Sequence, residues 1–290
     1  QNIFYPLTFI GFAVIGALFP FHTWSPSGHA SAPTAVSMLH AGVLMKLGGY
    51  GVFRIAMYLL PEGALNWADF FLILSAFGVI YGAFGAVMQK DLKYVNAYAS
   101  VSHLSLVLFA LLMFNKTAWT GAILQSLSHG LLTAMFFALI GMVYGRTHTR
   151  EISKLGGIMK VLPFIGAIYV ITGLAYLGLP GFSGFVAEMT VFMGAWQNPD
   201  GFYRIATIIS AASIVVTAVY ILRATGKTIM GPISDEHALL GDATWNEKFA
   251  AGLLIVGILI IGLAPFLINQ LIMPATDFLM INIDKAITLK

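Results

Sequence analysis

The chain has 290 residues, of which 59% are hydrophobic and 9% charged, and its mean hydropathy is +0.87. These values exclude a soluble globular domain and predict a membrane protein that crosses the bilayer several times. The net charge of +3 mostly reflects loop residues that orient such a chain, so lipids are implied as partners and nucleic acid is not. The chain has no cysteine, which excludes disulfides, thiolate zinc sites and cysteine-ligated iron–sulfur clusters within it.

Eight apolar segments are predicted to cross the membrane as helices, which gives an all-α fold. They span roughly residues 3–23, 33–60, 67–89, 94–114, 117–145, 161–196, 203–229 and 247–274. The chain starts at Gln1 with neither an initiator Met nor a basic signal-peptide start. We therefore expect it to be a piece of a longer protein.

The sixth segment, 161–196, is too long for one straight helix, because it would reach about 54 Å at about 1.5 Å per residue. Pro180 and Gly181 lie in its middle, and a break or an unwound turn is expected there. The first segment also carries a proline near one end, in ALFPFHTWSPSGH. Two interrupted helices in one chain are typical of transporters built from inverted repeats.

Basic residues predict which connections share a side of the membrane. Every second connection between crossings lies on the same side of the membrane, and one side receives the larger group of basic residues: Lys90, Lys93, Arg146, Arg150, Lys154, Lys160, Arg223, Lys227 and Lys248. The opposite side receives a smaller group: Lys116, Arg204, Lys285 and Lys290. The positive-inside rule places the larger group in the cytoplasm and both chain ends on the opposite face.

Two ionisable residues lie inside apolar segments. Lys46 is about halfway along segment 33–60, where a lysine costs roughly 3 kcal/mol to insert and is by default a functional candidate. Glu188 lies seven residues after Gly181, within the second half of the broken segment. A buried base and a buried acid in one bundle indicate proton handling, although each could instead hold helices together through a static pair or hydrogen bond.

Further polar residues lie at membrane depth between these two: His40, His103, Ser126, His129 and Thr133. A histidine can accept and release a proton near neutral pH, and hydroxyl groups can bridge gaps. His40 is expected to be structural, and either of the other two histidines could be a packing residue. A second possibility is that His103 and His129 hold a b-type haem.

Four motifs in order carry a resemblance to a known family. These are LFPFHTWSPSGHASAPTAVSMLHAGVLMKLGGYGVFR, QKDLKYVNAYASVSHLSLVL, LSHGLLTAMFF with YGRTHTREISKLGG, and GLPGFSGFVAE. Together they resemble the antiporter-like subunits of respiratory complex I. That family has about fourteen helices in two inverted five-helix repeats. The resemblance implies the end of the first repeat at 1–60, the second repeat at 67–229, and a final helix with a tail at 247–290.

The resemblance also assigns roles. Lys46 matches the lysine after the first broken helix, His103 and His129 match the central histidines of the second repeat, and Glu188 matches the broken-helix glutamate. A glutamate there favours the subunit M branch, since the related subunits and the cation/proton antiporters generally have lysine. The implied function is proton transfer within the membrane arm of an NADH:quinone oxidoreductase, in the energy-transducing membrane, beside other membrane-arm subunits and with no cofactor in this chain.

Two alternatives stay open, namely a subunit of a cation/proton antiporter and a subunit of an ion-pumping membrane-bound hydrogenase. One departure from the family pattern concerns the first broken helix. The family usually has a lysine seven residues before the histidine of the FPFHTW-like motif, and here that position is Ile15. The usual acidic residue of the next turn is also missing from SPSGHASAPT.

Overall fold

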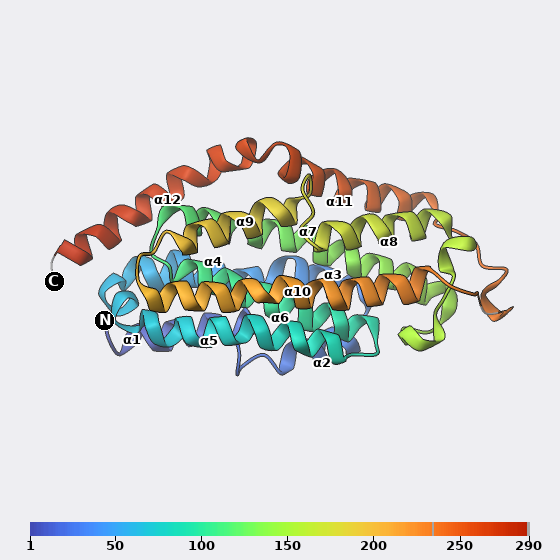
Figure 1. The fold of residues 1–290 in the computed structure, drawn as a ribbon, viewed down its shortest axis with the longest axis horizontal. Helices are drawn as coiled ribbons and strands as arrows, with labels where there is room; N and C mark the ends of the chain where they lie inside the picture. Colours follow the sequence, from blue (N-terminus) through green and yellow to red (C-terminus); the bar gives the residue numbers. More distant parts are fainter. Residues whose placement is uncertain (234, 289–290) are drawn as a thin grey trace.

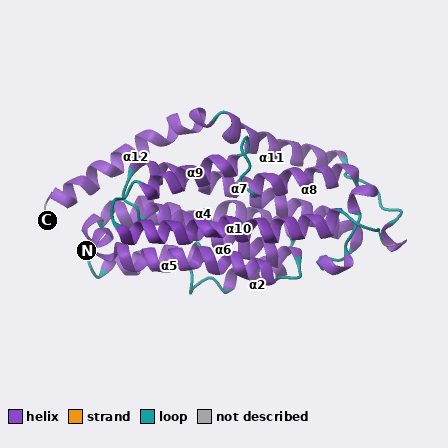
Figure 2. Cartoon of the chain, in the orientation of Figure 1, coloured by secondary structure: helices purple, strands orange, loops and turns teal. Residues whose placement is uncertain are grey.

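The computed structural model describes residues 1–233 and 235–288, which fold into an elongated bundle of helices with no strand, confirming the all-α prediction (Figure 1, Figure 2). The α-helices are α1 (Phe4–Ile15), α2 (Trp24–Ser31), α3 (Thr34–Leu39), α4 (Lys46–Gly51), α5 (Pro61–Met88), α6 (Leu92–Leu111), α7 (Lys116–Thr147), α8 (Pro163–Tyr176), α9 (Ser183–Trp196), α10 (Gly201–Ile229), α11 (Trp245–Leu263) and α12 (Pro265–Thr288). There are also two π-helical stretches, η1 (His40–Leu44) and η2 (Val52–Met57), and three short 3₁₀ turns, η3 (Ile152–Lys154), η4 (Ile158–Lys160) and η5 (Asp235–His237).

Seven helices in the described part of the chain are long and apolar enough to cross a membrane. Five are separate crossings: the continuous helix Thr34–Met57, α5, α6, α7 and α10. The other two, α11 and α12, follow each other along α7 and form one bent crossing (Figure 1). With the two broken helices α1/α2 and α8/α9, the chain passes through the bundle eight times, as predicted.

Both predicted interruptions are present, but the bounds of the first were wrong. Helix α1 ends at Ile15, and the crossing continues through a turn into α2 as far as Ser31, well beyond the predicted end at residue 23. The indole of Trp24 donates to the carbonyl of Val14 at 2.9 Å across this break. In the sixth crossing, Gly178 and Gly181 have φ of 66° and 96°, a region that glycine adopts without strain. These two glycines lie in the turn that separates α8 from α9.

The last crossing differs from the predicted single helix 247–274 with a tail. Helix α11 stops at Leu263, α12 begins at Pro265, and the former tail is helical to Thr288. Proline lacks the N–H that a continuous helix needs, which accounts for the bend. The bend also packs against the other break, because a Cβ on Gly262 would collide with the carbonyl oxygen of Gly181.

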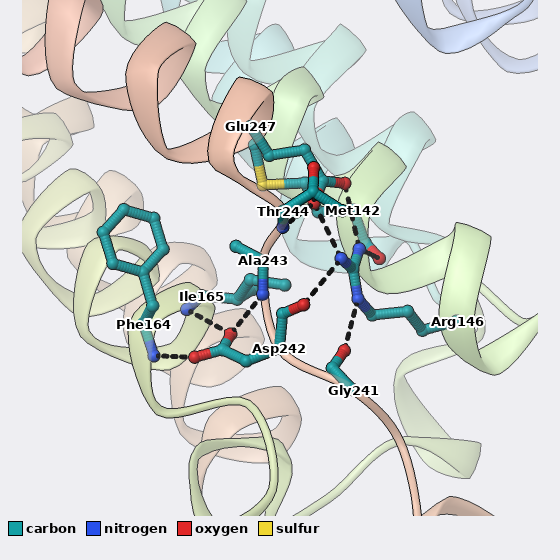
Figure 3. A network of polar contacts seen from close by, with 9 residues as sticks. All are labelled: Met142, Arg146, Phe164, Ile165, Gly241, Asp242, Ala243, Thr244 and Glu247. Carbon is teal, nitrogen blue, oxygen red and sulfur yellow. Dashed lines mark hydrogen bonds and ion pairs between the residues drawn. The ribbon is translucent and has the colours of Figure 1, made fainter.

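Ion pairs fasten this last crossing to both ends of α7. At one end Arg146 pairs with Glu247 at 2.7 Å, and at the other Lys116 pairs with Asp277 at 2.5 Å. Arg146 also donates to the carbonyl oxygens of Met142, Gly241 and Asp242 (Figure 3). The carboxylate of Asp242 accepts from the first N–H groups of α8, at Phe164 and Ile165 (Figure 3). One loop therefore holds the ends of α7, α8 and α11 together.

The path of the chain confirms the predicted grouping of basic residues. The connections after α2, α5, α7 and α10 lie at one end of the bundle, which we call the basic end, and the N-terminus and the end of α12 lie at the opposite end (Figure 1). Lys290 lies outside the described residues. The assignment of the basic end to the cytoplasm stays a prediction.

Candidate functional site

Three of the four predicted site residues come together in the middle of the bundle. The rings of His103 on α6 and His129 on α7 stack with centroids 4.8 Å apart. Glu188 on α9 places Oε1 3.3 Å from Nδ1 of His103. All three residues are at most 8% exposed. Three crossings therefore supply adjacent titratable groups at membrane depth, with a hydrogen-bond contact between His103 and Glu188 and a ring stack between His103 and His129.

His103 Nδ1 has two neighbours that require opposite protonation states. The side-chain nitrogen of Gln125 lies 3.0 Å away and donates to a lone pair on Nδ1, whereas an ionised Glu188 requires a proton on Nδ1. Nδ1 without a proton is therefore suited to the amide, and Nδ1 with a proton to the carboxylate. This geometry can exchange a proton between the ring and Glu188 without moving the backbone.

His129 is surrounded by hydroxyl groups. Thr133 Oγ1 lies 3.1 Å from the ring nitrogens, and the hydroxyl of Tyr176 lies 3.4 Å from Nδ1. Tyr176 also donates to Asn96 Oδ1 at 3.4 Å. The polar row predicted from the sequence includes Thr133 but not Tyr176, Asn96 or Gln125. A usable signal for Tyr176 was its position at the very end of α8, immediately before the break.

Lys46 reaches the same region from the second crossing. Its ammonium group donates to the carbonyl of Ala41, which belongs to the π-helical stretch η1. Such bulges inside α-helices are frequent at functional sites. The backbone of this crossing approaches α7 closely: a Cβ on Gly130 would lie 2.7 Å from the carbonyl oxygen of Gly42 and 3.8 Å from Cε of Lys46. The lysine stem therefore lies beside the residue that follows His129.

A further polar group near Lys46 was not expected from sequence. His29 on α2 is fully buried, contacts the sulfur of Met45 at 3.3 Å through Nε2, and packs against His40 with ring centroids 4.6 Å apart and the rings tilted by 42°. His40 thus packs against α2. Ile15 is half-buried at the end of α1, and the next residue, Gly16, packs on the backbone of α4.

Two hydroxyl groups of α7 have different roles. Ser128 donates to Ser183 at 2.8 Å and so fixes the start of α9, which carries Glu188. Ser126, predicted to belong to the polar row, donates to the carbonyl of Ala122 and lines, as Lys46 does, an apolar groove between α7 and the second and last crossings. Its place in the polar row stays a prediction.

The stacked arrangement does not suit a haem. Two axial histidines must point their nitrogens at the iron from opposite faces of a porphyrin. Here the rings of His103 and His129 face each other with an interplanar angle of 28°, Glu188 and Gln125 lie beside Nδ1 of His103, and Thr133 lies beside the nitrogens of His129. The two rings therefore leave no room for a porphyrin between them.

Comparisons with known proteins agree on one kind of relative. Residues 1–213 match the family described as NADH:quinone oxidoreductase/Mrp antiporter, TM. The chain is 39% identical over 264 residues to NAD(P)H-quinone oxidoreductase chain 4 1 of Synechococcus elongatus, covering 90% of this chain and 50% of that protein. It is 37% identical over 266 residues to NADH-quinone oxidoreductase subunit M of Rickettsia conorii, covering 91% of this chain and 53% of that protein. The chain thus spans about half the length of these relatives.

Solved structures give the same picture. A chain of respiratory complex I from Thermus thermophilus with bound NADH matches with a TM-score of 0.89 and 28% identity, over 96% of this chain and 58% of that one. A chain of the Mrp complex from Dietzia sp. matches with a TM-score of 0.84 and 19% identity, over 97% of this chain and 59% of that one. The second likeness shows a common fold alone.

Proposed function

Because the chain belongs to the NADH:quinone oxidoreductase/Mrp antiporter membrane family, we propose that it is part of a proton-translocating membrane-arm subunit of an NADH:quinone oxidoreductase. The observation that carries this proposal is the row formed by the half-buried Lys46 and the buried His129, His103 and Glu188. Ionisable groups are costly at membrane depth and are retained there mainly for ion or proton pathways.

The geometry suggests how the row works. A change of charge at Lys46 alters how favourably the neighbouring His129 holds a proton, because charges interact strongly where water is scarce. The stacked His103 takes up the proton and presents it from Nδ1 to Glu188 Oε1, while Gln125 stabilises the ring when that proton has left. The carboxylic acid so formed then releases the proton to a path of water.

The proposal has consequences for setting and partners. The subunit belongs in the energy-transducing membrane, beside other membrane-arm subunits, while electrons move from NADH to quinone elsewhere in the assembly. This chain holds no redox cofactor in that scheme. Glu188, where cation/proton antiporters generally have lysine, favours this reading over an antiporter or an ion-pumping hydrogenase.

The test is substitution of Lys46 in the full-length subunit within its assembled complex. Lys46→Ala and Lys46→Arg should both lower proton pumping by about a hundredfold, which is the low end of the range for losing a general acid–base group. The arginine variant keeps the charge but should still fail, because a guanidinium does not release its proton at working pH. Lys160→Ala, at an exposed position of the basic end, is the control and should pump as the parent does. Normal pumping by Lys46→Arg would refute proton exchange at Lys46, and turnover that depends on sodium would favour the antiporter alternative.

A further inference from the structure

Gln125 and Glu188 compete for one atom of His103. The side-chain nitrogen of Gln125 lies 3.0 Å from Nδ1, and Oε1 of Glu188 lies 3.3 Å from the same nitrogen. A ring nitrogen carries either a lone pair or a proton, so Nδ1 can accept from the amide or donate to the carboxylate. It cannot do both at once. The state of this one atom therefore decides which neighbour His103 binds.

The rest of the ring does not enter this competition. Nε2 of His103 is buried and has no hydrogen-bond partner within the described part of the chain. The ring also contacts two other rings: His129 stacks on it, and Tyr176 lies at 74° to it with centroids 5.2 Å apart. The hydrogen bond made by one ring nitrogen decides which nitrogen of a neutral histidine holds the proton. Gln125 and Glu188 therefore set the tautomer of His103 between them.

Its own helix places Gln125 for this contact. The residue lies one turn before His129 on α7, so the two side chains share the face of α7 that meets His103. Gln125 is 2% exposed, and its oxygen Oε1 is buried without a hydrogen-bond partner among the residues that the structure describes. A half-satisfied amide is costly to bury. Apolar packing therefore does not account for a glutamine here, whereas its contact with Nδ1 does.

The amide of Gln125 suits either state of Nδ1. When Nδ1 is bare, the NH₂ group donates to its lone pair, which is the arrangement in the structure. After half a turn of the amide, Oε1 would face Nδ1 and accept from an N–H, and the turn breaks no hydrogen bond of Oε1 within the described chain. An ionised Glu188 offers only acceptors and so disfavours a bare Nδ1. Gln125 is thus the neighbour that stabilises the bare nitrogen.

We propose that Gln125 is a positioning residue that keeps His103 and Glu188 from locking into a static ion pair. Transfer of the proton breaks the Nδ1–H bond of a protonated His103 and forms an O–H bond on Glu188, which leaves a neutral ring and a carboxylic acid. The amide then donates to the vacated lone pair and holds the remaining ring proton on Nε2. When Glu188 releases its proton and becomes ionised, Nδ1 is already bound. The inference rests on the proposed function, because it takes His103 and Glu188 as the groups that exchange the proton.

The tautomer of His103 can be measured without turnover. In the assembled complex with isotope-labelled histidine, the ring signals of His103 are those that disappear in His103→Gln, and nitrogen chemical shifts distinguish Nδ1–H from Nε2–H. The neutral ring of the parent should carry its proton on Nε2. Gln125→Met keeps the length of the side chain but has no N–H donor, so Nδ1 should become protonated and donate to Glu188. Thr120→Val is the matched control and should keep the parent's tautomer, because this hydroxyl on the same helix donates to the carbonyl of Lys116.

Pumping per assembled complex gives the second readout. Gln125→Met should slow it about fivefold, the factor that one net hydrogen bond contributes, and Thr120→Val should leave it unchanged. A bare Nδ1 in Gln125→Met would overturn the proposal, and so would a protonated Nδ1 combined with normal pumping. The two proposals fail separately. Normal pumping by Glu188→Gln would refute the proposed function, and the tautomers of the parent and of Gln125→Met would still decide whether the amide holds Nδ1.

Discussion

Gly121→Ala should disable the site through a displacement of less than 1 Å. Helices α7 and α9 touch through glycine, and a Cβ on Gly121 would lie 2.6 Å from the backbone nitrogen of Val191. Ordinary contact begins at 3.4 Å, so α9 must move away by about 0.8 Å. Because Glu188 is on the same short helix, a shift of this size can take its carboxylate from 3.3 Å to about 4 Å from His103, beyond hydrogen-bond range.

Two effects of Gly121→Ala can be measured separately. Overpacking of this kind should lower stability by about 1–3 kcal/mol, seen as a lower melting temperature of the purified complex. A misplacement of about 1 Å in a catalytic arrangement can cost about a hundredfold, so pumping per quinone reduced should fall far more than the amount of assembled complex. Gly145→Ala is the matched control on the same helix, because nothing lies within 4 Å of its added Cβ. Pumping by Gly121→Ala equal to that of Gly145→Ala would refute the requirement for this close approach.

Three further predictions concern single positions. Glu188→Asp should keep more pumping than Glu188→Gln, since only the carboxylate titrates, and equal pumping by the two would make Glu188 a static hydrogen-bonding residue. Arg146→Ala should lower the melting temperature of the complex by leaving Glu247 half-buried and unpaired, at about 2–4 kcal/mol, whereas Lys154→Ala at an exposed pair should leave the melting temperature unchanged. Ile15→Lys should change the pH profile of turnover by placing a second cation near Lys46, and an unchanged profile would show that position 15 faces away from it.

The sequence alone determined the class and the path of the chain. Apolar runs of membrane length gave eight crossings, and Pro180 with Gly181 marked the break in the sixth, because both signals act locally along the backbone. The grouping of basic residues at one end followed from counting crossings. The bend at Pro265 was not predicted, because the apolar run continues through it. The length of an apolar run does not show where the hydrogen bonds of a helix are interrupted. The division into two repeats stays a prediction.

Only the tertiary structure decided which side chains meet. Gln125 and Ser126 are neighbours in sequence, yet about 100° of helical rotation per residue turns the first toward His103 and the second toward an apolar groove. In a helix that is apolar on its lipid face and tightly packed on the other, hydrophobic periodicity does not show which polar residue faces inward. The partners of His103 therefore follow from how the helices are rotated and packed against one another.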